Sequence, residues 1–101
     1  MSYYTFKIRG TYIVKDISTD TLGSYPHNFI EVNEILYFVA TDGNSGFELF
    51  RTDGTELGTY IVRDIWPAGS YSSLPEFLTE LNSLLFFVAE DGVNGVELWM
   101  F

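Results

Sequence analysis

The chain has 101 residues, with 14 acidic side chains against 5 lysines and arginines, and its formal net charge is -9 at pH 7. Binding to nucleic acid or to a membrane headgroup surface needs clustered cations, so this charge argues against both kinds of partner. The chain has no cysteine, which excludes disulfides, thiolate zinc sites and cysteine nucleophiles.

The apolar content is high for a chain of this size. Hydrophobic residues make up 47% of the sequence and aromatic residues 18%. A domain this small buries only about two thirds of its unfolded surface, so we expect some apolar residues to contact another subunit. No apolar run approaches the roughly 20 residues of a membrane span, and residues 1–7 lack the apolar core of a signal peptide. We expect a single repeat domain over residues 1–101.

The first expected strand is Thr11–Ile17, and its sequence returns almost unchanged as Thr59–Ile65. The two segments lie about 48 positions apart, and the blades of β-propellers repeat every 40–50 residues or so. We interpret the first segment as the last strand of a blade, available for assembly. Its residues are Thr11, Tyr12, Ile13, Val14, Lys15, Asp16 and Ile17.

The first copy of the repeat reads as four strands, and we place the first blade at about residues 26–65. Asn33-Glu34 is a tight turn, because asparagine tolerates the positive φ that such hairpins need. The second strand is apolar on both faces, so it must be covered on both sides. The four strands are His27–Val32, Ile35–Ala40, Phe47–Phe50 and Thr59–Ile65.

The second copy follows at an offset of about 49 positions, and we place the second blade at about residues 75–101. One residue is gained in the loop after Ile65, and Asn82-Ser83 supplies the tight turn. The copy has no fourth strand of its own, so we expect residues 11–17 of a neighbouring chain to complete it. Its strands are Glu76–Leu81, Leu84–Ala89 and Val96–Trp99.

These elements predict an all-β protein made of two four-stranded antiparallel blades of a β-propeller. No segment has the 3.6-residue period of a helix. A strand that is buried on both faces fits a radial stack of blades, whereas a β-sandwich buries one face and shows cleaner polar alternation. Two blades cannot close a ring that needs about 4–8, so we expect oligomerisation to complete it.

Three Asp-Gly turns connect the expected strands, and we interpret them as structural. In such turns the carboxylate accepts backbone N–H groups, and glycine supplies the unusual dihedral angles. A calcium site is the alternative, with oxygens from Asp42, Asn44, Asp53 and Glu56, but their spacing matches no known calcium loop. The turn residues are Asp42, Gly43, Asp53, Gly54, Thr55, Asp91 and Gly92.

Glu48 and Glu97 occupy equivalent positions between apolar neighbours. Because catalytic residues rarely recur in every repeat, we interpret both as structural acceptors for a neighbouring turn, and we expect no catalytic residue, no enzymatic activity and no resident metal. The lone His27 cannot form a metal site or a catalytic triad, and we expect it at the surface. The candidate ligand aromatics, suited to sugar rings or peptides, are Trp66, Tyr71 and Trp99.

The segment Glu48–Thr55 reads Glu-Leu-Phe-Arg-Thr-Asp-Gly-Thr and resembles the signature of the ELWxxDGT repeat family. The agreement continues through Phe87–Gly92, and Trp99 matches the tryptophan of the family where Phe50 departs from it. The resemblance covers nearly all of residues 11–99. It implies a propeller-like fold in tandem arrays of large bacterial proteins, often extracellular or on the cell surface, and it implies no known catalysis.

The Asp-Gly-Thr turn occurs in one copy only, at Asp53, so the chain resembles an excised or engineered part of a longer array. We therefore expect a structural and interaction module whose blade pair assembles with other copies into a closed homo-oligomeric ring, a trimer or tetramer, by exchange of residues 11–17. A glycan-binding, lectin-like module is the alternative, and a protein ligand is a further expected kind of partner.

Overall fold

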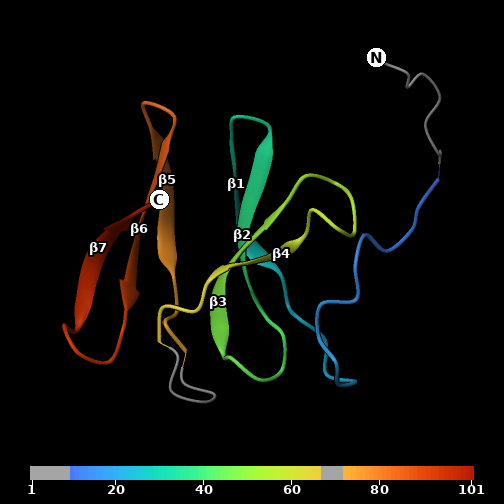
Figure 1. The fold of residues 1–101 in the computed structure, drawn as a ribbon, viewed down its shortest axis with the longest axis horizontal. Helices are drawn as coiled ribbons and strands as arrows, with labels where there is room; N and C mark the ends of the chain where they lie inside the picture. Colours follow the sequence, from blue (N-terminus) through green and yellow to red (C-terminus); the bar gives the residue numbers. More distant parts are fainter. Residues whose placement is uncertain (1–9, 67–71) are drawn as a thin grey trace.

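The computed structural model describes residues 10–66 and 72–101, and in these ranges it contains seven strands and no helix (Figure 1). The strands form two antiparallel sheets, one of four strands and one of three, so the prediction of an all-β protein is confirmed. No helix that could cross a membrane occurs in these ranges. The strands are β1 (His27–Val32), β2 (Ile35–Thr41), β3 (Phe47–Thr52), β4 (Tyr60–Arg63), β5 (Glu76–Leu81), β6 (Leu84–Glu90) and β7 (Val96–Met100).

Sheet one contains the four strands β1, β2, β3 and β4, and each strand pairs with the next one in the chain. In the β1–β2 turn, Asn33 and Glu34 both have positive φ, 52° and 70°. This is the conformation of the type I′ turns that match the twist of antiparallel strands. β4 is shorter than the predicted Thr59–Ile65, because Thr59 bonds within the preceding turn and the N–H of Ile65 bonds to a side chain.

Sheet two repeats the first three strands of sheet one, with the same local irregularities. In the β5–β6 turn, Asn82 and Ser83 have φ of 54° and 65°. A bulge interrupts the first strand of each sheet, where the equivalent residues Asn28 and Phe77 share a φ of 57°. The internal repeat is therefore a repeat of backbone conformation as well as of sequence.

The two sheets pack face to face, and one hydrophobic core lies between them (Figure 1). Sheet one contributes Tyr37 and Leu49, on what we call its forward face, and sheet two contributes Phe87. Phe87 is the equivalent of Phe38, which lies on the opposite side of sheet one from Tyr37 because side chains alternate along a strand. We call that opposite side the rear face. The forward face of one sheet thus packs on the rear face of the next.

The rear face of sheet one is covered in part by the segment that precedes β1. Ile17 packs there on a second core cluster that includes Phe38 and Phe50. Residues 11–17, which the sequence predicts as a strand, form no strand within this chain. A strand needs a ladder partner, and the predicted partner, the outer edge of β7, lies at the opposite end of the molecule (Figure 1). Exchange of this segment with a neighbouring chain stays a prediction.

Candidate functional site

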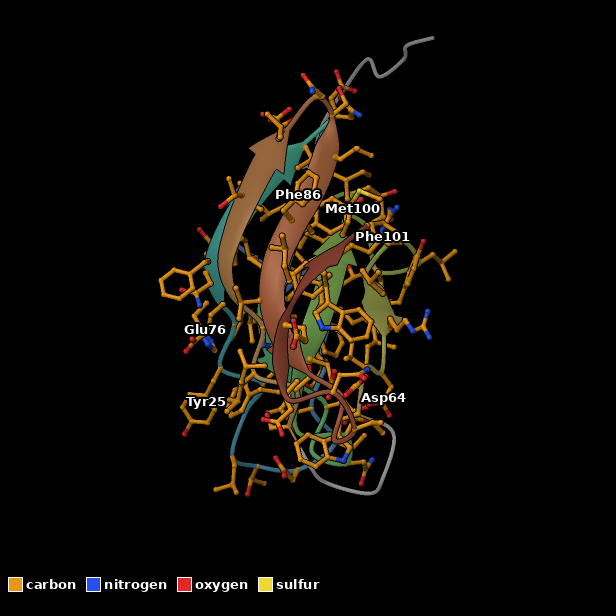
Figure 2. The ribbon with its side chains drawn as sticks, turned by 90° about the vertical axis from the view of Figure 1, so that its left-hand side faces the viewer. Tyr25, Asp64, Glu76, Phe86, Met100 and Phe101 are labelled. Carbon is orange, nitrogen blue, oxygen red and sulfur yellow. The ribbon has the colours of Figure 1, made fainter. Side chains whose placement is uncertain are left out.

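Sheet two exposes the same forward face that sheet one buries. Leu49 in sheet one is 1% exposed, and its equivalent in β7, Leu98, is 70% exposed. Val32 is 6% exposed, and its equivalent in β5, Leu81, is 55% exposed. Figure 2 looks onto this side of sheet two and labels Phe86 of β6, the equivalent of a buried tyrosine in sheet one. Exposed apolar surface of this kind is a candidate interaction site.

The strand β7 also has an open edge. In sheet one the equivalent strand, β3, pairs with β4, so that Leu49 lies opposite Arg63 and Arg51 lies opposite Tyr60. Within the described part of the chain, β7 pairs with β6 alone. The N–H and C=O groups on its outer side therefore have no ladder partner there, and an edge of this kind is a template for another strand.

A buried carboxylate joins sheet one to the connection that leads into sheet two. Glu48 is 0% exposed. Its Oε1 accepts hydrogen bonds from Ile65 N at 3.1 Å and Ser73 Oγ at 2.6 Å, and its Oε2 accepts one from Ser73 N at 3.2 Å. Burial raises the pKa of Glu48 to about 7 in spite of these hydrogen bonds, and the nearby charge of Asp64 adds to the rise. We call this arrangement of Glu48, Ile65 and Ser73 the Glu48 clamp.

The equivalent residue in β7, Glu97, has no clamp within the described residues. Its side chain is exposed, and it accepts no hydrogen bond from any residue whose position the structure describes. By the repeat, the equivalents of the donors Ile65 and Ser73 are Ile17 and Ser24, in the segment before β1. The equivalents of the acceptor and of the two donors therefore lie in two separate places in the chain.

The residues before β1 contact sheet one in the same way as the residues before β5 contact sheet two. Ser24 C=O accepts a hydrogen bond from Thr41 N at 3.0 Å. In the second copy, Ser73 C=O accepts the equivalent bond from Glu90 N, also at 3.0 Å. In each sheet, the segment that leads into the first strand is thus hydrogen-bonded to the end of the second strand, at equivalent residues.

A groove of about 350 Å³ lies between this segment and the rear face of sheet one. It is lined by the exposed side chains of Ile13 and Phe29 among others. Lys15 holds the segment in place by donating a hydrogen bond from Nζ to the C=O of Thr59 at 2.8 Å. In sheet two, Leu78 is the equivalent of Phe29 and packs on the core between the sheets. The groove therefore lies on sheet one where the equivalent surface of sheet two is covered by the contact between the sheets.

The Asp53-Gly54-Thr55 turn satisfies its own carboxylate. Oδ1 of Asp53 accepts hydrogen bonds from Thr55 N at 3.0 Å and Thr55 Oγ1 at 2.6 Å, and these bonds lower the pKa of Asp53. Gly54 has a φ of 96°, which other residues rarely adopt. The backbone of Gly58 lies against the same carboxylate, and Arg51 Nη2 is 3.8 Å from its Oδ2. This is the hydrogen-bond pattern of a structural turn.

Asp42 and Asp91 close the other two Asp-Gly turns in the same way. Each Oδ1 accepts the N–H groups two and three residues later, all at 2.8 Å, and Gly43 and Gly92 have φ of 91° and 85°. Asp42 and Asp53 lie at opposite ends of β3, so they do not converge on one cation as the calcium alternative requires. Among the described residues, no group of three or more acidic or histidine side chains is placed to hold a metal ion.

The candidate ligand aromatics that the structure describes are placed against the fold. Trp99 donates a hydrogen bond from Nε1 to the C=O of Ala89 at 3.2 Å and packs on the core between the sheets. The ring of Trp66 lies beside Gly92 in the β6–β7 turn. Tyr71 lies outside the described residues. Trp66 and Trp99 thus contact the protein itself, and glycan binding stays a prediction without a specific contact to support it.

Sequence reasoning missed the two serines of the clamps, Ser24 and Ser73. The signal that points to them is a repeated Ser-x-Pro pattern, which places Pro26 and Pro75 two residues after the equivalent serines. It was hidden because serine before proline is common in loops and by itself indicates only a turn. His27, expected at the surface, is exposed at the start of β1.

Comparisons of the chain with protein-family models, with curated proteins and with solved structures found no match.

Proposed function

We propose that this chain is a non-enzymatic structural and interaction module, a pair of β-propeller blades that assembles with further copies into a closed ring. The observation that carries the proposal is the contrast between Leu49, 1% exposed, and its equivalent Leu98, 70% exposed. Equivalent apolar residues differ in this way when one of two like interfaces has its partner and the other does not.

The packing between the two sheets supports a ring. The forward face of sheet one contacts the rear face of sheet two, so the contact joins two different surfaces, and each repetition of it adds a sheet by the same rotation. Contacts of this kind close when the rotation divides a full turn, and propellers close with about 4–8 blades. With two blades in each chain, a dimer is the smallest ring, and we favour a trimer or tetramer.

The resemblance to ELWxxDGT repeats supports the same function. It rests on Glu48–Thr55 and on its partial recurrence at Glu97–Trp99. One glutamate of that motif, Glu48, accepts hydrogen bonds from the connection between the sheets, and its equivalent, Glu97, is exposed at the strand that the proposal pairs with another copy. The resemblance also favours an extracellular or cell-surface bacterial protein.

The surroundings of Glu48 support a structural role for this carboxyl. Glu48 has a pKa of about 7, the range in which a general acid or base works. Its two oxygens, however, are taken by donors of Ile65 and Ser73, and the side chain is fully buried. A substrate has no route to it while the clamp is closed.

The native mass of the purified chain tests the proposal. The chain has a mass of 11.5 kDa, and we expect light scattering after size exclusion to give one species of three or four chains. Far-UV circular dichroism of that species should show β-structure without helix. A folded monomer at every concentration tested would contradict the proposed assembly.

A further inference from the structure

We propose that Glu97 accepts hydrogen bonds from Ile17 and Ser24 of a second copy of this chain, as Glu48 accepts them within one chain. The inference rests on the proposed assembly and names the side chains that join the copies. It makes β7 of one copy and residues 11–24 of another the two halves of one interface.

The acceptor half is prepared on β7. Glu97 is exposed and stands between Val96 and Leu98, which are 65% and 70% exposed. The equivalent residues of sheet one show what covers such a triplet, because β4 pairs with β3, Leu49 packs in the core between the sheets, and the connection to sheet two holds Glu48. What β7 lacks is therefore one more paired strand, followed in the chain by a backbone N–H donor and then by a serine.

The donor half is prepared on the segment before β1. The hydrogen bond from Thr41 N to the C=O of Ser24 fixes this serine on sheet one where Ser73 is fixed on sheet two. Ser24 is half-buried, and its Oγ has no hydrogen-bond partner among the described residues. Ile17 already packs on the rear face of sheet one, as Ile65 packs on the core between the sheets. The segment thus needs only an acceptor carboxylate.

The donors for Glu97 come from a second copy, because residues 10–24 cannot reach β7 of their own copy. Sheet one lies between β7 and residues 10–24, which are at opposite ends of the molecule (Figure 1). The required sequence, a strand followed by a connection with a Ser-x-Pro, is present in this chain at Thr11–Pro26 and would be a coincidence in an unrelated partner.

The register of the new pairing follows from sheet one. The pairs between β3 and β4 are Leu49 with Arg63, Phe50 with Ile61 and Arg51 with Tyr60. The equivalent pairs between two copies are Leu98 with Lys15, Trp99 with Ile13 and Met100 with Tyr12. Met100 and Tyr12 are 59% and 60% exposed in the single chain, so both are accessible for this pairing.

A disulfide trap tests this register, since the chain has no cysteine of its own. Opposed residues of paired strands have the Cα spacing that a disulfide needs. On mild oxidation, we expect the double variant Met100→Cys, Tyr12→Cys to form covalent multimers up to the size of the ring on non-reducing gels. The matched control, Met100→Cys with Ile13→Cys, turns one thiol to the other face of the strand and should form far fewer. Equal crosslinking of the two variants would overturn the register.

A charge-matched pair of variants tests the clamp itself. We expect Glu97→Ala to raise the dissociation constant of the assembly at least about tenfold, because Ser24 and Ile17 lose a charged acceptor. Glu56→Ala removes the same charge from an exposed turn and should leave the constant unchanged. In a double-mutant cycle, Ser24→Ala should raise the dissociation constant of the assembly much less in the Glu97→Ala background than in the unmodified chain.

The outcomes separate this inference from the proposed function. If Glu97→Ala assembles as well as Glu56→Ala, or if its effect adds fully to that of Ser24→Ala, the clamp is wrong and the proposed assembly stands. If the unmodified chain is a monomer, both are wrong. Circular dichroism of each variant confirms that the comparison is made between folded chains.

Discussion

Glu48 is a buried carboxyl in an inner strand of sheet one. Among the described residues no cation pairs with it, and it accepts hydrogen bonds only from two residues of one connection, Ile65 and Ser73. Burying an unpaired charge costs free energy. Protonation of the carboxyl lowers this cost, and so do hydrogen bonds from donors to both of its oxygens. The contact between sheet one and the connection to sheet two therefore includes a titratable group, beside the hydrophobic core between the sheets.

Folding stability should fall as the pH rises from about 5 to 7. Burial raises the pKa of Glu48 from its ordinary value of 4.5 to about 7, so in this range the folded chain holds a proton that the unfolded chain has released. The stabilisation from that proton is complete below the unfolded value and is lost as the pH passes through the folded one. The expected loss is roughly 2 kcal/mol between pH 5 and pH 7, measured by urea unfolding at fixed pH.

Two variants isolate this effect. Glu48→Gln should show a much smaller change over the same range, whereas Glu56→Gln, at an exposed position, should keep the slope of the unmodified chain. The turn carboxylates do not interfere, because hydrogen bonds lower the pKa of Asp53 and Asp91 and their contribution is lost only at more acidic pH. A Glu48→Gln chain with an unchanged slope would show that another group titrates.

At the scale of the element, the sequence predicted the seven strands of the described ranges to within two residues at each end. Those strands are marked by apolar runs between Asn and Asp-Gly turns, which are local signals. The left-handed φ of Phe77 was not predictable, because a bulky aromatic disfavours it and pairing with β6 imposes it. The length of β4 was not predictable either, since the N–H of Ile65 is taken by Glu48, far away in the sequence.

The β1–β2 turn offers a stabilising substitution that tests its conformation. Glu34 has a φ of 70° at the second central position of the turn, where a type I′ turn favours glycine. We expect Glu34→Gly to raise the free energy of unfolding by about 0.5–1 kcal/mol in urea titrations. Glu34→Ala, the control, removes the same carboxylate but keeps a Cβ and should give no gain. Equal effects of the two variants would assign the change to charge instead of backbone strain.

At the scale of the whole molecule, the repeat predicted that two like sheets exist but not which surfaces they share. The face of β7 that carries Leu98 became visible as a candidate site only when its exposure was compared with that of Leu49. Likewise, residues 11–17 carry the sequence of a strand and form none alone, because a strand is specified by its partner as much as by its own residues. The proposed assembly rests on contacts between copies, which one copy of the sequence does not specify.

A tandem fusion of two copies through a flexible Gly/Ser linker tests the ring as a whole and measures its size. Each fused chain carries four blades, and its internal seam pairs Glu97 of the first copy with Ser24 of the second. If the unmodified chain forms a tetramer, two fused chains fill the same eight places, and light scattering should give an unchanged native mass. If it forms a trimer, fused chains cannot fill six places evenly, and the mass should exceed that of the unmodified ring in discrete steps. A mass that rises continuously with concentration would contradict closure, because it is the behaviour of an open filament.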